Sequence, residues 1–345
     1  MVRKFLLVVI FSAILITPVV LTGVEVDWVL GDVRYTHLKS EWEELNPGMT
    51  LISGDRVQTG PGGETILLDG DGEIHILENT SFTVSEKYEN AKRKSAFMLF
   101  LGRMKFKLGK SKQEEPDIQT QAVNLAIRGT EFEVGSGYDG STIVLMEEGS
   151  VAVQGDTEEL VLGVGEGTEV RFGDEPAEKF DVMTKVIDWD AWFDTSKEAV
   201  KGNEVELLTR ILTKMEDISS RIAEYEETRA DSLKKKDEYL ALRDKHAGEG
   251  DEEKAASYSR MAGTESKRAY HSLVNIRFLA LSAVGLSDMA QRIYTGMEEP
   301  TEEADQLYEN IQDRYRSIEE KYIWEGDRER LEKKAEKKRG CLRAF

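Results

Sequence analysis

One segment of the sequence resembles part of a nucleotide-binding motif. Gly109-Lys110-Ser111 matches the end of a phosphate-binding loop. That motif requires a glycine five residues before Gly109, where this chain has Met104. Because the segment follows an alternating apolar run, we expect a turn at the end of a strand and no nucleotide cofactor.

A second segment suggests a cation site. Asp69-Gly70-Asp71-Gly72 combines carboxylates with glycines, as calcium loops do. A twelve-residue calcium loop that starts at Asp69 would need a bidentate glutamate at its last position, which is Thr80. We therefore predict a hairpin turn, with a weak cation site on Asp69 and Asp71 as the alternative.

The sequence offers no clear catalytic group. Its four histidines are scattered without metal-ligand spacing, and no serine lies in a Gly-x-Ser-x-Gly segment. The single cysteine, Cys341, lies in a charged tail, where a free thiol is expected and an intermolecular disulfide is the alternative. Because two carboxylates need only be close in space, a glycosidase stays open. We predict no enzyme, no cofactor and no metal site.

Arg128, Gly129 and Thr130 are candidates for a structural turn or a binding site. They join the apolar runs 123–127 and 132–134. The Arg128 guanidinium either pairs with a nearby acid and fixes the turn, or lines a ligand groove. We expect Gly129 to adopt a left-handed or closely packed conformation, because three similar segments have Asn or Gly at this position. Those positions are Asn79, Gly149 and Gly167.

Three aromatic residues form a candidate docking patch. Trp189, Trp192 and Phe193 lie on a short amphipathic segment beyond Pro176. They either join the two halves of the chain or form an exposed patch that binds a partner.

The elements that carry these residues begin with a β-rich half. From residue 28 to 172, apolar residues alternate with polar ones, and glycine-rich turns separate the runs. A period of two indicates strands with one buried face. A short unit of a turn residue, Ser or Thr, and alternating apolar positions recurs, which favours a β-sandwich or a β-solenoid-like roll.

Specific motifs in this half resemble the FecR domain family. They are Leu51-Ile52-Ser53-Gly54-Asp55-Arg56-Val57-Gln58-Thr59-Gly60, Ala126-Ile127-Arg128-Gly129-Thr130-Glu131-Phe132 and Glu148-Gly149-Ser150-Val151. The resemblance implies an extracytoplasmic, non-catalytic β domain that binds or senses a partner. Members that regulate sigma factors carry a cytoplasmic segment before a membrane helix, whereas here only residues 1–4 precede the apolar run. We therefore do not expect the sigma-regulator role.

The second half changes to a helical period. Apolar residues recur every three or four positions from Glu204, and again between 307 and 322. The segment 247–250 should end one helix, with Asp251 as the N-cap of the next, and Thr301 should start another after Pro300. The stretch 273–286 is too short and too polar to span a membrane and indicates a central helix. We predict a helical bundle, with a coiled-coil dimer as the alternative.

The N-terminus indicates export. Arg3 and Lys4 precede an apolar run, and Pro18 follows it near a small-residue zone at Gly23. Cleavage near Gly23 and an uncleaved anchor are both open. We therefore divide the chain into a signal peptide or anchor at 1–23, a FecR-like β domain at 25–175, a linker segment at 176–200 and a helical region at 201–340.

The excess of acidic residues limits the classes of partner that the protein can bind. With 46 basic and 66 acidic residues the net charge is −20, which argues against nucleic acid. We predict a non-enzymatic exported protein, periplasmic or in the cell envelope, that binds an envelope protein or a cell-wall component, with helices for assembly or transmission and a homo-oligomer as an option. The alternatives are a membrane-anchored signalling component and a cell-wall binding or hydrolysing protein.

Overall fold

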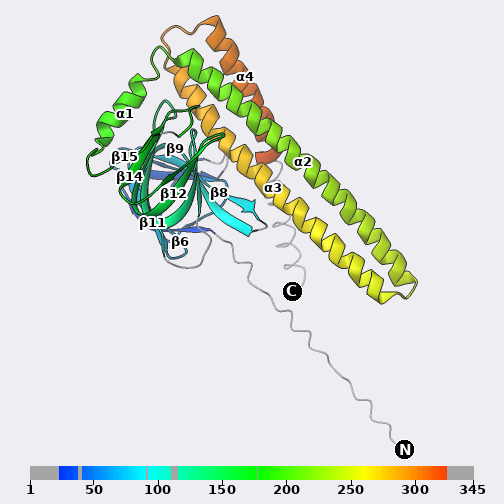
Figure 1. Ribbon diagram of the computed structural model, residues 1–345. Helices are drawn as coiled ribbons and strands as arrows, with labels where there is room; N and C mark the ends of the chain where they lie inside the picture. The colour runs from blue at the N-terminus through cyan, green and yellow to red at the C-terminus, as the bar shows by residue number, and fades with distance from the viewer. Residues whose placement is uncertain (1–22, 38–40, 91, 110–115, 177, 325–345) are drawn as a thin grey trace, which may run out of the picture.

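The chain folds into a β region followed by a helical region (Figure 1). The computed structural model describes residues 23–37, 41–90, 92–109, 116–176 and 178–324. The expected signal segment and Cys341 lie outside the described residues, so those predictions stay open. The coarse expectation of an all-β part followed by an all-α part is confirmed.

In the described part of the chain, fifteen strands make one hydrogen-bonded sheet. They are β1 Val24–Leu30, β2 Val33–His37, β3 Glu43–Glu44, β4 Thr50–Leu51, β5 Asp55–Thr59, β6 Glu64–Asp69, β7 Gly72–Ile76, β8 Ser81–Glu89, β9 Lys92–Lys107, β10 Asp117–Gln119, β11 Asn124–Ser136, β12 Thr142–Gln154, β13 Glu159–Leu162, β14 Glu166–Val170 and β15 Phe180–Asp181.

The long strand β9 makes the sheet fold back on itself. Its first part pairs with β8 and, in parallel, with β10, whereas its last part pairs with β7 and β11. Gly102 lies between the two parts with φ +97°, and a Cβ at this glycine would collide with the backbone of Thr80. A side chain would therefore be strained and crowded at this point of β9.

The alternating residues form the core between the folded-back parts of the sheet. Ile74, Ile76 and Phe82 are fully buried, as the period of two predicts. The rings of Phe106 and Phe132 stack with centroids 4.8 Å apart, which links β9 to β11. This apolar core holds the β region together, because burial of such side chains is the main favourable term in folding.

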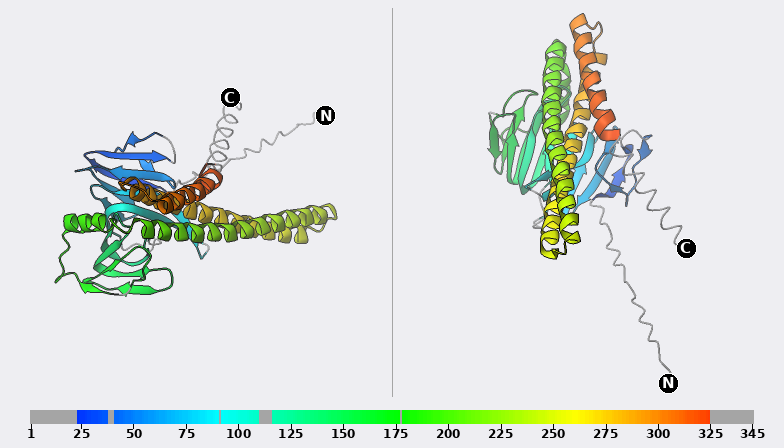
Figure 2. Two further views of the ribbon diagram at one scale, coloured as in Figure 1. Left: turned by 90° about the horizontal axis from the view of Figure 1, so that it is seen from above. Right: turned by 90° about the vertical axis from the view of Figure 1, so that its right-hand side faces the viewer.

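Among the described residues, two long helices form an antiparallel hairpin, one shorter helix packs along it, and another lies beside the sheet (Figures 1 and 2). The helices are α1 Trp189–Glu198, α2 Glu204–Gly248, α3 Glu252–Thr295 and α4 Glu302–Ile318, and the π-helix Glu319–Trp324 continues α4. Asp251 and Thr301 cap α3 and α4 through their side chains, so both predicted helix starts are confirmed. With 45 residues, α2 is about 67 Å long.

The hairpin is joined along a seven-residue repeat. Every seventh residue of α3 is buried, and most of these residues are alanine: Ala255, Ala262, Ala269, Ile276, Ala283 and Ala290. Such a repeat keeps one seam facing a neighbouring helix, and small side chains let the backbones approach. The heptad pattern is therefore used within one chain, between α2 and α3. A homo-oligomer stays a prediction that would need a different surface.

The C-terminal half of α3 lies against the β region. Phe100 of β9 packs on Gly285, where a Cβ would overlap the ring, and Arg56 of β5 forms an ion pair with Asp288. One stretch of α3 is long and apolar enough to cross a membrane, but two thirds of it, 67%, is buried inside the protein. The expected 14-residue central helix is thus part of a much longer one, whose apolar character reflects contacts with the sheet and with the other helices.

The segment 176–200 carries regular structure. β15 adds an edge strand beyond residue 175, and α1 follows it. The sheet therefore continues past the end expected for the β domain. The division of the chain into independent domains stays a prediction.

Candidate interdomain cleft

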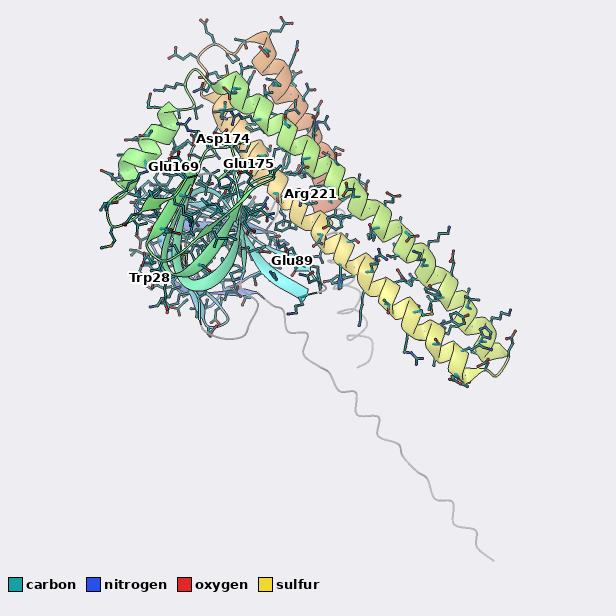
Figure 3. The ribbon with its side chains drawn as sticks, viewed as in Figure 1. Trp28, Glu89, Glu169, Asp174, Glu175 and Arg221 are labelled. Atoms are coloured by element: carbon teal, nitrogen blue, oxygen red, sulfur yellow. The ribbon has the colours of Figure 1, made fainter. Side chains whose placement is uncertain are left out.

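A cleft of about 880 Å³ separates part of the sheet from the helical hairpin. Its walls come from the end of β8, from β9, β10, β11 and β12, and from the facing sides of α2 and α3. Figure 3 labels Glu89, at the end of β8, and Arg221, on α2, which both line this cleft. Neither region forms the cleft alone.

The β wall presents a row of amide side chains. Gln119 of β10 lies opposite Asn124 of β11, and Asn124 lies opposite Gln154 of β12. Residues in register on adjacent strands point to the same face of a sheet. All three line the cleft. Behind this row, Gln121 is buried and uses both ends of its amide, since it donates to the Phe100 carbonyl and accepts from the Ser136 hydroxyl.

The α2 wall carries charges that are matched by nearby opposite charges. Arg210 donates to Asp174 at 3.0 Å, and Lys214 pairs with Asp156. Arg221 lies 3.6 Å from Asp217 on the same helix. In Figure 3, Asp174 lies beside the part of α2 that follows its start. The charges on this wall are therefore largely compensated.

Lys87 lies where β8 meets the helices. Its ammonium is 2.5 Å from the Asp117 carboxylate, and it lies near the Phe278 ring. Burial lowers the pKa of Lys87, and the Glu89 carboxylate partly opposes this effect. The ion pair with Asp117 compensates the charge of this half-buried lysine.

Polar contacts of Asn275 and Ser282 connect α3 to the sheet at the cleft, and we call these contacts the clasp. The Asn275 side chain of α3 accepts from the Tyr88 backbone N–H at 2.8 Å and donates to the Tyr88 carbonyl at 3.0 Å. The Tyr88 ring stacks on His271 with centroids 4.0 Å apart. Ser282 donates to Gln119 at 2.8 Å. Asn275 thus takes the place of a neighbouring strand at the outer edge of β8.

The predicted docking patch lies on α1 against the sheet. Trp189 packs on Gly135, where a Cβ would meet the ring, and the Arg103 guanidinium lies 4.8 Å from the Trp189 ring centroid. The Trp192 indole donates to Glu169 at 2.7 Å, and the Phe193 ring contacts both tryptophans. These contacts join α1 to the β region. All three rings are half-buried, so a role in binding a further partner stays a prediction.

Arg128, Gly129 and Thr130 lie within β11. Arg128 is opposite Ser150 of β12, and the register shifts between Arg128 and Glu131. The sequence suggested a turn between the apolar runs 123–127 and 132–134. In the structure residues 124–127 and 132–134 both belong to β11, and the segment between them is a shift in the pairing register. The structure does not describe the side chains of these three residues, and their role stays a prediction.

The similar positions support the conformational reasoning in part. Asn79 has φ +56° and Gly149 has φ +94°, both in the left-handed region. Gly167 lies in β14, where a Cβ would collide with the Phe180 ring. Backbone conformation therefore favours Asn79 and Gly149, whereas close packing favours Gly167.

The described residues contain no cluster of three or more side chains suited to a metal ion. Asp69 and Gly72 pair at the β6–β7 hairpin, as expected for a turn. Burial raises the pKa of Asp69, and the Ser95 hydroxyl lies 3.4 Å from its carboxylate. Gly109 follows β9, close to Asp71, while Lys110 and Ser111 lie outside the described residues.

A smaller hollow of about 340 Å³ lies on the outer face of β1, β6 and β7. Trp28, labelled in Figure 3, lines it together with Glu64 and His75. Trp28 is 39% exposed. Its described lining residues all come from the β region.

Sequence reasoning missed the cleft. Gln119, Asn124 and Gln154 are unremarkable along the chain, and only strand pairing places them side by side. Asn275 interrupts the apolar stretch 273–286, which was the single available signal that this part of α3 contacts a polar group.

The structure combines a β region with a helical hairpin, and a polar cleft is shared between them. Residues 55–152 match the family model described as FecR protein. This segment runs from the start of β5 into β12 and includes Gln119 and Asn124 of the amide row. The chain therefore contains a FecR domain, and the resemblance seen in its motifs is confirmed.

Two crystal structures, at 2.50 and 1.65 Å resolution, are similar to part of the chain; both are described as "a putative anti-sigma factor from Parabacteroides distasonis ATCC 8503". Their sequence identities are 16% and 15%, and their TM-scores are 0.32 and 0.31. Each match covers 36% of this chain and 59% of the matched chain. This chain therefore spans less than two thirds of the length of either matched chain. No curated protein matches the sequence. The assignment therefore rests on the family match.

Proposed function

We propose that this protein is a non-enzymatic binding protein of the cell envelope, in which the FecR domain and the helical hairpin together hold a partner in the cleft. The observation that carries this proposal is the shared origin of the cleft walls, with β10–β12 on one side and α2 on the other. Clefts between two parts of a protein are frequent binding sites.

The clasp between the two parts supports a role in transmission. A partner in the cleft touches α2 and the sheet at once. The hydrogen bonds of Asn275 and Ser282 connect the sheet to α3. Beyond Tyr270, which still contacts Tyr88, the hairpin extends past the β region (Figure 1). Its far end is thus available to report binding to another component.

The envelope location rests on the N-terminal segment and on the FecR domain. Arg3 and Lys4 followed by an apolar run are typical of a signal peptide. FecR domains imply an extracytoplasmic position. The partner is accordingly an envelope protein or a cell-wall component.

Site-specific photo-crosslinking in intact cells tests the proposal. A benzophenone amino acid replaces Thr213, which faces the cleft from α2, or Ala223, which is exposed and outside the cleft lining. We expect irradiation to give a specific adduct from position 213 in the envelope fraction and none from position 223. Equal adducts from both positions, or none from either, would contradict a partner site in the cleft.

A further inference from the structure

The amide row has a regular geometry. Gln119, Asn124 and Gln154 are direct neighbours across three adjacent strands. Adjacent strands lie about 4.8 Å apart, so the three amides repeat at roughly this spacing across the β wall. A linear ligand with evenly spaced polar groups can therefore meet one amide after another.

These amides have unused hydrogen-bonding groups. The Gln119 carbonyl oxygen accepts from Ser282, which leaves its amino group as a donor. Among the residues that the structure describes, the side-chain amides of Asn124 and Gln154 bond to no other protein group, and both residues are exposed. Each amide offers a carbonyl acceptor and two N–H donors. The row therefore suits hydroxyl or acetamido groups, which also both donate and accept.

The opposite wall adds acceptors and a ring. The Thr209 and Thr213 hydroxyls donate to helix carbonyls at 2.8 and 3.1 Å, which leaves lone pairs on both oxygens. Tyr225 and Phe278 also line the cleft. Apolar rings beside neutral polar groups match a ligand that has both C–H faces and hydroxyl edges.

The charges argue against an ionic ligand. The cations Lys87, Lys214 and Arg221 each have a carboxylate nearby, from Asp117, Asp156 and Asp217. An anionic ligand would have to displace those carboxylates or lie close to them, and a cationic ligand would be repelled by the lysine and arginine side chains. Among the described residues, the groups left unpaired on the β wall are neutral.

Strand pairing argues against an extended peptide on this wall. Peptides that add to a sheet need a strand with a free edge. β10 pairs with β9 and β11, while β11 and β12 are hydrogen-bonded on both sides of Asn124 and Gln154. A ligand here must be recognised by side chains.

We propose that the cleft binds a neutral glycan strand, which lies across β10, β11 and β12 beneath α2. This inference rests on the proposed function and specifies its partner as a polysaccharide. Gln119, Asn124 and Gln154 bond to successive hydroxyl or acetamido groups, while Tyr225 packs on a sugar face.

Isothermal titration of the purified protein with chitohexaose and cellohexaose tests the inference. We expect at least one of them to bind, and the double variant Asn124→Ala/Gln154→Ala to bind about tenfold more weakly or worse, because each lost hydrogen bond costs about a factor of five. Thr213→Trp should also weaken binding, because the indole would occupy part of the cleft beside α2. Asn310→Ala removes an exposed amide from α4 and should bind like the parent.

Several results would contradict the glycan assignment or separate it from the proposed function. Failure of both oligosaccharides to bind, or undiminished binding by both cleft variants, would overturn the glycan assignment. Tighter binding of an oligogalacturonate would overturn the argument for a neutral ligand. An adduct with a protein from position 213 without any glycan binding would reject the glycan and keep the proposed function, whereas absence of both would reject the two together.

Discussion

Replacement of Asn275 by alanine should loosen the contact between the FecR domain and the helical hairpin. The substitution removes two hydrogen bonds, at 2.8 and 3.0 Å, to the N–H and C=O of Tyr88. Each is worth about 1 kcal/mol net, and a buried backbone group left without a partner costs about 1–3 kcal/mol. Because Tyr88 is only half-buried, water can replace part of the loss. We expect the free energy of unfolding to fall by about 2 kcal/mol.

Urea denaturation measures this change, and hydrogen exchange locates it. The midpoint should fall while the slope with urea stays constant, because the surface exposed on unfolding hardly changes. The Tyr88 amide should exchange faster, since its acceptor is gone. Asn275→Asp keeps an acceptor for the Tyr88 N–H but loses the donor to the Tyr88 carbonyl, so its loss of protection at Tyr88 should be smaller.

The matched control is Asn310→Ala, an exposed amide on α4 whose loss should change stability by less than about 0.5 kcal/mol. A loss below about 0.5 kcal/mol in Asn275→Ala as well, with unchanged exchange at Tyr88, would refute the reasoning. It would mean that Asn275 does not hold the edge of β8 in solution.

Two further predictions concern stability. Asp69→Asn removes a carboxylate whose pKa is raised by burial, and such a carboxylate lowers the stability of the parent as pH rises through the raised pKa. In urea denaturation the variant should therefore be more stable than the parent at pH 8, and this difference should vanish at pH 3. An equal difference at both pH values would contradict the raised pKa of Asp69. In α3, Ala262→Leu should destabilise the hairpin by about 1–3 kcal/mol because Ala262 is buried in the seam. By contrast, Gly263→Ala at the adjacent exposed position, with open space around it, should stabilise the hairpin by about 0.5–1 kcal/mol. If calorimetry showed that Ala262→Leu and Gly263→Ala change the stability in the same direction, Ala262 would not lie in the seam between α2 and α3.

The sequence alone determined the local features of this protein. The alternation of Ile74, Ile76 and Phe82 marked buried strand faces, and all three are fully buried. Asp251 and Thr301 marked two helix starts, where their side chains accept from the backbone three residues on. The motif around Arg128 identified the FecR domain. These features are readable because strand periodicity, helix capping and motif order depend on neighbours along the chain.

Only the tertiary structure decided which surfaces meet. A period of two says that Gln119, Asn124 and Gln154 face one side of their own strands, but not that the three strands are adjacent and in register. A period of seven says that α2 and α3 each have an apolar seam, but not that the two seams join within one chain. Asn275 lies 187 residues from Tyr88, a separation at which no local pattern acts. The cleft exists because the hairpin packs on the sheet, and non-local packing of this kind is fixed by the fit of whole surfaces rather than by any one segment.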